Sequence, residues 1–260
     1  MASSDSENPP RNAAAHAPFL AFDTSGPTAR VAIVDDKGEV LHHAERVSDR
    51  HSGTLLPLCH ELIGRAGLTV AGLSGVACGS GPGSFTGLRV GLAVAKGLAL
   101  ACDLPLLLVP SLTALAVDLD LARAASSAPD AHDRLLAPCI DAGKGEIYVQ
   151  LFLRSQSPGA PPAALTPELR TTATAFAEQL KSEARVVLIG GTGADRHLQA
   201  LQDLLGQEAV LPAFPGPSAR AIGHLALERL RRGERDDLDS AVPVYGRPPD
   251  ITKPKRPPTG

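Results

Sequence analysis

The glycine-rich segment from Gly79 to Arg89, GSGPGSFTGLR, has the residue types and spacing most suggestive of chemistry. A phosphate-binding P-loop would end in Gly-Lys-Ser/Thr, but Ser84-Phe85-Thr86 supplies no lysine. A dinucleotide-binding fingerprint fails because Thr86 stands at its last glycine, and Pro82 has no N–H for a pyrophosphate. A nucleophile elbow would read Gly-x-Ser-x-Gly, and the nearest string, GLSGV, lacks the last glycine. The segment therefore predicts a tight strand-to-helix turn.

The helix predicted after this turn, over residues 86–101, carries a stripe of small residues. Gly87, Gly91, Ala95 and Ala99 recur every four residues and so lie on one face. A smooth face of this kind lets another backbone come close. It could pack on the chain's own sheet or against a partner helix, and the spacing alone favours the sheet.

Two aspartates stand where predicted strands end. The segments Asp23-Thr24-Ser25 and Asp141-Ala142-Gly143 each follow a buried strand and lead into a second strand. Two such turns face each other across the cleft of the actin/Hsp70/sugar-kinase fold, where backbone N–H groups bind nucleotide phosphates and the aspartates hold the metal. The residues leave two interpretations open: turns kept for shape, or a weak nucleotide site.

A third turn, GGTGAD, contains Gly191 and Gly193. It is similar to the glycine turn beside the adenosine pocket of that fold. It is equally typical of an ordinary strand-to-helix turn capped by Asp195.

The histidines and cysteines show no metal-ligand spacing. The four cysteines are far apart, among apolar neighbours, which predicts buried free thiols. His42 and His43 are adjacent on a predicted strand, so they point to opposite faces. The sequence therefore predicts no metal site.

Composition indicates a globular protein of one large or two modest domains. The chain has 260 residues, of which 43% are hydrophobic and 20% charged. Its net charge is −3 and aromatic residues make up 3%, which argues against a stand-alone nucleic-acid binder. The first 17 residues lack the pattern of a signal peptide, and charged residues interrupt the apolar stretch Leu88–Val109, so a cytoplasmic protein without a membrane span is expected.

The order of predicted elements repeats. Strands over 19–23, 28–35 and 39–46 are followed by a helix, strand, helix and strand, and a related pattern restarts at Leu135. This predicts an α/β, two-lobed, actin-like (ASKHA, ribonuclease H-like) fold, each lobe a mixed sheet flanked by helices. The expected divisions are a disordered tail over 1–17, an N-terminal lobe over 18–123, a C-terminal lobe over 134–216, a C-terminal helix over 217–235 and a disordered tail over 246–260.

One family combines these features. The string GSGPGSFTGLRVGLAVAKGLA, with HSGTLLP upstream and Pro243-Val244-Tyr245 near the end, closely resembles the TsaB (YeaZ) family from about Phe19 to Tyr245. Family members are paralogues of TsaD, the subunit that places a threonylcarbamoyl group on the adenosine next to the anticodon of tRNAs. They pair with TsaD through their N-terminal lobes, and the ATPase TsaE joins the pair. The resemblance implies the same partners here, with tRNA met indirectly through the complex, and a homodimer as an alternative when the chain is alone.

The resemblance also implies a subunit without a catalytic centre or cofactor. TsaD binds its metal through two histidines four residues apart, and Ser111 and Leu115 occupy those positions here. A hydroxyl is a poor ligand for a transition metal and leucine is none. Alternatives are an enzyme of this fold, either a sugar-kinase-like phosphotransferase or a glycoprotease-like metallopeptidase, and a binding module unrelated to tRNA.

The partner interface is then predicted on two helices, over 52–66 and 86–101. The residues expected to contact the partner are those of the apolar and small-residue stripes: Leu55, Leu58, Leu62, Gly87, Leu88, Gly91 and Ala95.

Overall fold

The computed structural model describes residues 17–47, 53–124, 135–154, 160–183 and 187–245. The tails predicted over 1–17 and 246–260 fall outside these ranges, apart from Ala17, as do residues 125–133 between the two predicted lobes.

The first lobe is built on a five-stranded sheet with the order β3-β2-β1-β4-β5. Strands β1, β2 and β3 form an antiparallel meander, and β4 and β5 extend it in parallel from β1. The strands are β1 (Phe19–Asp23), β2 (Thr28–Val34), β3 (Val40–Val47), β4 (Gly75–Gly79) and β5 (Leu106–Val109).

The second lobe repeats this arrangement around a seven-stranded sheet, whose main path is β10-β7-β6-β11-β12; off this path, β8 pairs with β6, and β9 pairs with β8. β6 pairs antiparallel with β7 and parallel with β11, as β1 pairs with β2 and β4. The strands are β6 (Leu135–Gly143), β7 (Glu146–Val149), β8 (Phe152–Leu153), β9 (Ala163–Ala164), β10 (Leu169–Thr172), β11 (Val187–Gly190) and β12 (Val210–Leu211).

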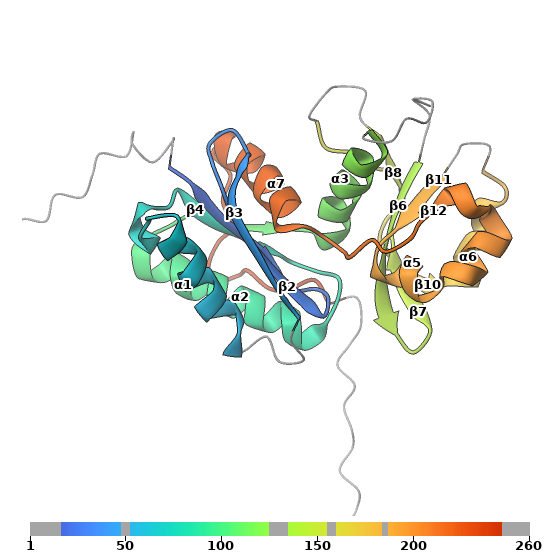
Figure 1. Ribbon diagram of the computed structural model, residues 1–260, viewed down its shortest axis with the longest axis horizontal. Coiled ribbons are helices and arrows are strands. Elements are labelled where there is room, and N and C mark those ends of the chain that lie inside the picture. Colours follow the sequence, from blue (N-terminus) through green and yellow to red (C-terminus); the bar gives the residue numbers. More distant parts are fainter. Residues whose placement is uncertain (1–16, 48–52, 125–134, 155–159, 184–186, 246–260) are drawn as a thin grey trace, which may run out of the picture.

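Helices cover both faces of each sheet, and two of them lie between the sheets (Figure 1). α1 and α2 pack on one face of the first sheet. α3 and α7 pack on its other face, and α3 also packs on the second sheet. α4 and α6 cover the far face of the second sheet. The helices are α1 (Leu55–Arg65), α2 (Phe85–Cys102), α3 (Ser111–Ala124), α4 (Ala173–Leu180), α5 (Thr192–Arg196), α6 (Leu198–Leu205) and α7 (Ala219–Arg231), with single 3-10 turns η3 (Val70–Gly72) and η4 (Gln207–Ala209).

Strand alternation produces this layering. Leu20 and Phe22 on β1 point to the core beneath α1 and α2, whereas Phe19 and Ala21 point to the core beneath α3 and α7. Every residue of β1 is buried, as expected of a central strand covered on both faces. β1 ends at Asp23, where the first predicted turn begins, whereas β6 continues to Gly143, so the second predicted turn, residues 141–143, forms the last three residues of the strand.

Candidate functional site

The turn after β1 is closed against the start of α2. The Ser84 N–H donates to the carbonyl of Ser25 at 2.7 Å, and the Thr24 hydroxyl donates to the carbonyl of Gly87 at 2.8 Å. Ser84 caps α2, since its hydroxyl accepts from the Gly87 N–H at 3.2 Å. The glycine-rich segment is therefore a strand-to-helix turn, as predicted, and it is fastened to the first of the two cleft turns.

Asp23 is fully buried and its carboxylate is already occupied. One oxygen accepts from the N–H and the hydroxyl of Ser25, at 2.9 and 2.6 Å, and the other accepts from the Ser111 hydroxyl at 3.0 Å. Burial raises the pKa of this carboxyl, and these hydrogen bonds oppose the rise. The carboxylate that would hold the metal in this fold is thus hydrogen-bonded within the chain.

Glycines make this closure possible. A β-carbon on Gly79 would lie 1.9 Å from the Asp23 carboxylate, and one on Gly83 would lie 2.4 Å from the Ser25 carbonyl oxygen. Gly83 also has a φ of 155°, which favours glycine. The turn after β1 and the glycine-rich segment therefore pack tightly around Asp23.

Ser111 and Leu115 lie in the core at the beginning of α3. Both side chains are fully buried. The Ser111 hydroxyl accepts from the Gly81 N–H at 3.2 Å while it donates to Asp23, and Leu115 packs on the second sheet. Within the described ranges, no group of three or more His, Cys, Asp or Glu is arranged to hold a metal ion.

The second predicted turn is also bonded internally. Asp141 accepts from the Gly143 N–H at 3.0 Å and forms an ion pair with Arg196 at 2.7 Å. β-Carbons on Gly191 and Gly193 would lie 2.3 and 2.7 Å from the carbonyl oxygen and sulfur of Cys139. These two glycines let α5 approach β6 closely, which favours the interpretation as turns kept for shape.

The residues predicted to form the partner interface point inward instead. The side chains of Leu55, Leu58, Leu62, Leu88 and Ala95 are at most 2% exposed, and Gly87 and Gly91 are buried. A β-carbon on Gly91 would lie 2.4 Å from the Thr24 hydroxyl oxygen. The predicted contact surface is therefore corrected. The small-residue stripe of α2 packs on the chain's own sheet, because strand β1 and its turn need a smooth helix face there.

A second stripe lies on the opposite face of α2 and is exposed. Its members also recur every four residues: Phe85, Arg89, Ala93, Gly97 and Ala101. Beside it Leu100 is 76% exposed, and Leu56 of α1 is 48% exposed. Among the described residues, α2 is the one helix long and apolar enough to span a membrane by length and composition alone. Its inner face is occupied by the sheet, so the apolar surface left over is this outer stripe.

The sequence patterns do not predict a polar cluster that lies between α3, α7 and β2. The carboxylate of Asp118 on α3 accepts from the N–H and the hydroxyl of Ser218, both at 2.7 Å, where Ser218 caps α7. Arg30 of β2 lies nearby, 4% exposed, and pairs with Glu45 at 3.3 Å. Burial raises the pKa of Asp118 to about 6, although Ser218, Arg30 and Arg220 favour the charged form.

The raised pKa predicts how stability depends on pH. A carboxyl with a folded pKa above its unfolded value favours folding at low pH, and this contribution is lost as pH rises through 6. We expect the stability of Asp118→Asn relative to the native chain to rise by about 1 kcal/mol between pH 5 and 7.5. Denaturant titrations of both proteins across this range measure it. A difference that is flat or falls with pH would contradict the assignment.

Fold and site together define a class: a two-lobed, actin-like protein in which the aspartates of both predicted phosphate turns are bonded to groups of the same chain. A family model described as "TsaD: tRNA N6-adenosine threonylcarbamoyltransferase" matches residues 42–157. The tRNA threonylcarbamoyladenosine biosynthesis protein TsaB of Escherichia coli (strain K12) is 32% identical over 235 residues, covering 87% of this chain and 93% of that protein. The protein of the same name from Bacillus subtilis (strain 168) is 29% identical over 230 residues, with the same coverage.

Solved structures agree. YeaZ from Pseudomonas aeruginosa superposes with a TM-score of 0.71 at 27% identity, covering 88% of this chain and 99% of that chain. A structure described as an uncharacterized protein with similarity to peptidase YEAZ, also from P. aeruginosa, gives a TM-score of 0.73 at 28% identity, covering 89% and 100%. The chain belongs to the TsaB family.

Proposed function

We propose that this chain is a non-catalytic subunit in the biosynthesis of threonylcarbamoyladenosine in tRNA, and that it acts by pairing with a TsaD-like catalytic subunit. The observation that carries the proposal is the burial of Ser111 and Leu115. The resemblance equates these two positions with the metal-ligating histidines of TsaD, and both side chains are buried here: Leu115 lies in the hydrophobic core, and Ser111 is hydrogen-bonded to Gly81 and Asp23.

The outer faces of α1 and α2 are the surface we propose for the partner. Ala93 and Gly97 make the centre of the exposed stripe smooth, which suits close crossing of a second helix. Leu100 supplies an exposed apolar side chain on the same helix, and Leu56 supplies one on α1. Two helices from each subunit would then form a four-helix contact. The proposed interface thus lies on the two helices that the sequence predicts, α1 and α2, but on their exposed faces instead of their buried ones.

The remaining partners follow from the same proposal. We further propose that the subunit works without a nucleotide or metal cofactor of its own, and the internal hydrogen bonds of the two predicted turns support this. A TsaE-like ATPase and tRNA would meet the assembled pair, in the cytoplasm. The net charge of −3 is in keeping with tRNA being held mainly by other subunits.

Reconstitution tests the function directly. With the catalytic subunit, the ATPase, tRNA and threonylcarbamoyl-adenylate present, we expect modified nucleoside only when this chain is added. This chain alone with tRNA and the adenylate should yield none if, as proposed, the catalytic centre belongs to the partner subunit. Mass spectrometry of digested tRNA measures the product.

Two results would reject the proposal. Full modification without this chain would show that the subunit is dispensable. Phosphotransfer or peptide hydrolysis by the isolated chain would instead support the alternative, an enzyme of the same fold.

A further inference from the structure

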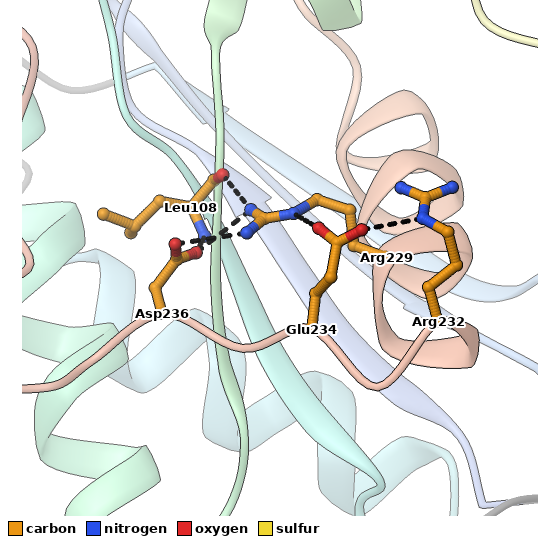
Figure 2. A network of polar contacts seen from close by, with 5 residues as sticks. All are labelled: Leu108, Arg229, Arg232, Glu234 and Asp236. Carbon is orange, nitrogen blue, oxygen red and sulfur yellow. Dashed lines mark hydrogen bonds and ion pairs between the residues drawn. The ribbon is translucent and has the colours of Figure 1, made fainter.

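The end of the described chain forms a strap across the first lobe, which we define as residues 234–245. At its beginning, the Asp236 N–H donates to the Leu106 carbonyl at 2.8 Å, and the Asp236 carboxylate accepts from the Leu108 N–H at 2.6 Å. Arg229 completes the attachment by donating to the Leu108 carbonyl at 2.8 Å and to Asp236 at 3.0 and 3.2 Å (Figure 2). The strap thus supplies hydrogen-bond partners to the open edge of β5.

The strap then passes the core beneath α2 and ends at the glycine-rich turn. Ala241 is 7% exposed and Leu238 packs on the same cluster. The Val244 N–H donates to the Ser80 carbonyl at 2.7 Å. These contacts fix Tyr245, the last residue of the Pro-Val-Tyr motif, beside the first turn of α2.

Three side chains meet there. The ring of Tyr245 lies 4.9 Å from that of Phe85, tilted by 37°, and the Arg89 guanidinium lies 5.3 Å from the Phe85 ring centre. Phe85 and Tyr245 are 38% and 42% exposed, so the cluster is held in place but open to solvent. Aromatic and arginine side chains held in this way are typical of the strongest contacts in protein interfaces.

The cluster continues the exposed stripe of α2. Phe85 and Arg89 are its first two members, so a helix crossing at Ala93 and Gly97 would extend toward them. The family model of the threonylcarbamoyltransferase matches residues 42–157, which include α1 and α2, so a catalytic subunit of that family would carry a helix equivalent to α2. In an antiparallel pair, the beginning of one helix meets the end of the other.

The end of a helix is complementary to this cluster. Its last carbonyls carry partial negative charge, which attracts a guanidinium. In this chain, the corresponding end of α2 presents Leu100, 76% exposed, and the exposed carboxylate of Asp103. An apolar side chain and a negative group are what Phe85, Tyr245 and Arg89 could bind.

We propose that Phe85, Arg89 and Tyr245 form an anchor for the carboxyl-terminal end of the partner subunit's equivalent helix, and that the strap exists to build it. The inference rests on the proposed pairing with a TsaD-like subunit. A nucleic-acid platform is the competing use of aromatic and arginine side chains. It is disfavoured because Val242 and Val244, 65% and 48% exposed, and the acidic Asp237 and Asp239 lie on the same strap.

Partner affinity of full-length variants tests the anchor. We expect Tyr245→Ala and Arg89→Ala each to weaken binding of the catalytic subunit by about tenfold. Tyr245→Phe keeps the ring and should bind within about twofold of the native chain. Two exposed side chains of the second lobe provide matched controls, Leu165→Ala and Lys181→Ala, and should leave binding unchanged. Calorimetric titration gives the affinities, and melting curves verify folding.

The outcomes are distinguishable. If the native chain binds the catalytic subunit and both alanine variants bind equally well, the anchor is wrong and the proposed function stands. If the native chain itself does not bind, the proposed function fails and the anchor fails with it. Unchanged partner affinity with weakened binding of the assembled complex to tRNA would overturn the anchor in favour of a nucleic-acid platform.

Discussion

Replacement of Gly91 by leucine is expected to lower the melting temperature by roughly 10 °C, because overpacking of this site costs about 3 kcal/mol. The first side-chain atom would already lie 2.4 Å from the Thr24 hydroxyl oxygen and 3.9 Å from the Phe22 ring. Thr24 could not move away without losing its 2.8 Å hydrogen bond to Gly87. The strain therefore falls on the turn that also holds Asp23.

The matched change is Gly97→Leu on the opposite face of the same helix. Nothing lies within 4 Å of a β-carbon there, so the variant should fold with an unchanged or slightly higher melting temperature, since leucine favours helix over glycine by roughly 0.5–1 kcal/mol. Its bulk would hold a partner helix away from the stripe. We therefore expect weakened binding of the catalytic subunit and less tRNA modification.

Melting curves and partner affinities of the two variants, measured side by side, check both expectations. A stable Gly91→Leu protein with weakened partner binding would restore the inner stripe as the interface. Undiminished partner binding by Gly97→Leu would show that the partner contacts another surface.

Sequence could predict that α2 carries a stripe of small residues, but not which stripe is covered by the sheet. The positions Gly87, Gly91, Ala95 and the positions Ala93, Gly97, Ala101 have the same four-residue period, and both are smooth. Helical periodicity places the two stripes on opposite faces of α2. Only the approach of Phe22 and Thr24 to Gly91 decides which one faces inward.

The turn after β1 illustrates a related limit of sequence patterns. A strand that ends in Asp before small residues correctly predicts the turn and the doubled fold. It does not reveal that Ser111, 88 positions further along, donates to Asp23. Partners so distant in sequence leave no periodic signal, and the same holds for Asp118 with Ser218.

The strap is the largest feature that sequence patterns missed. Its residues show neither helical nor strand periodicity, because a single backbone bridge and a few side-chain hydrogen bonds, rather than a continuous ladder, attach it to β5. The Pro243-Val244-Tyr245 motif was the available signal, and it marks the strap's second attachment at Ser80. A motif without an assigned role can thus indicate where a chain end is fixed.

Replacement of Asp236 by alanine should release the strap. Its carboxylate accepts from the Leu108 N–H and from two nitrogens of Arg229, so the change leaves an edge-strand donor and a half-buried guanidinium without this partner. Hydrogen bonds to charged groups contribute roughly 1.5–3 kcal/mol each when donors are left unpaired, so we expect a loss of about 3 kcal/mol. The melting temperature should fall by roughly 5–10 °C.

The same substitution should weaken partner binding at a distance. Tyr245 depends on the strap for its place beside Phe85, so Asp236→Ala should lower affinity for the catalytic subunit as Tyr245→Ala does, and the double variant should bind no more weakly than Tyr245→Ala. Hydrogen exchange should accelerate at the amides of Leu108 and Val244. Asp239→Ala removes an equal charge from an exposed position of the strap and serves as the control. Fast exchange at Val244 with native partner affinity would show that the strap does not build the contact, whereas unchanged exchange at Val244 would show that Asp236 does not anchor it.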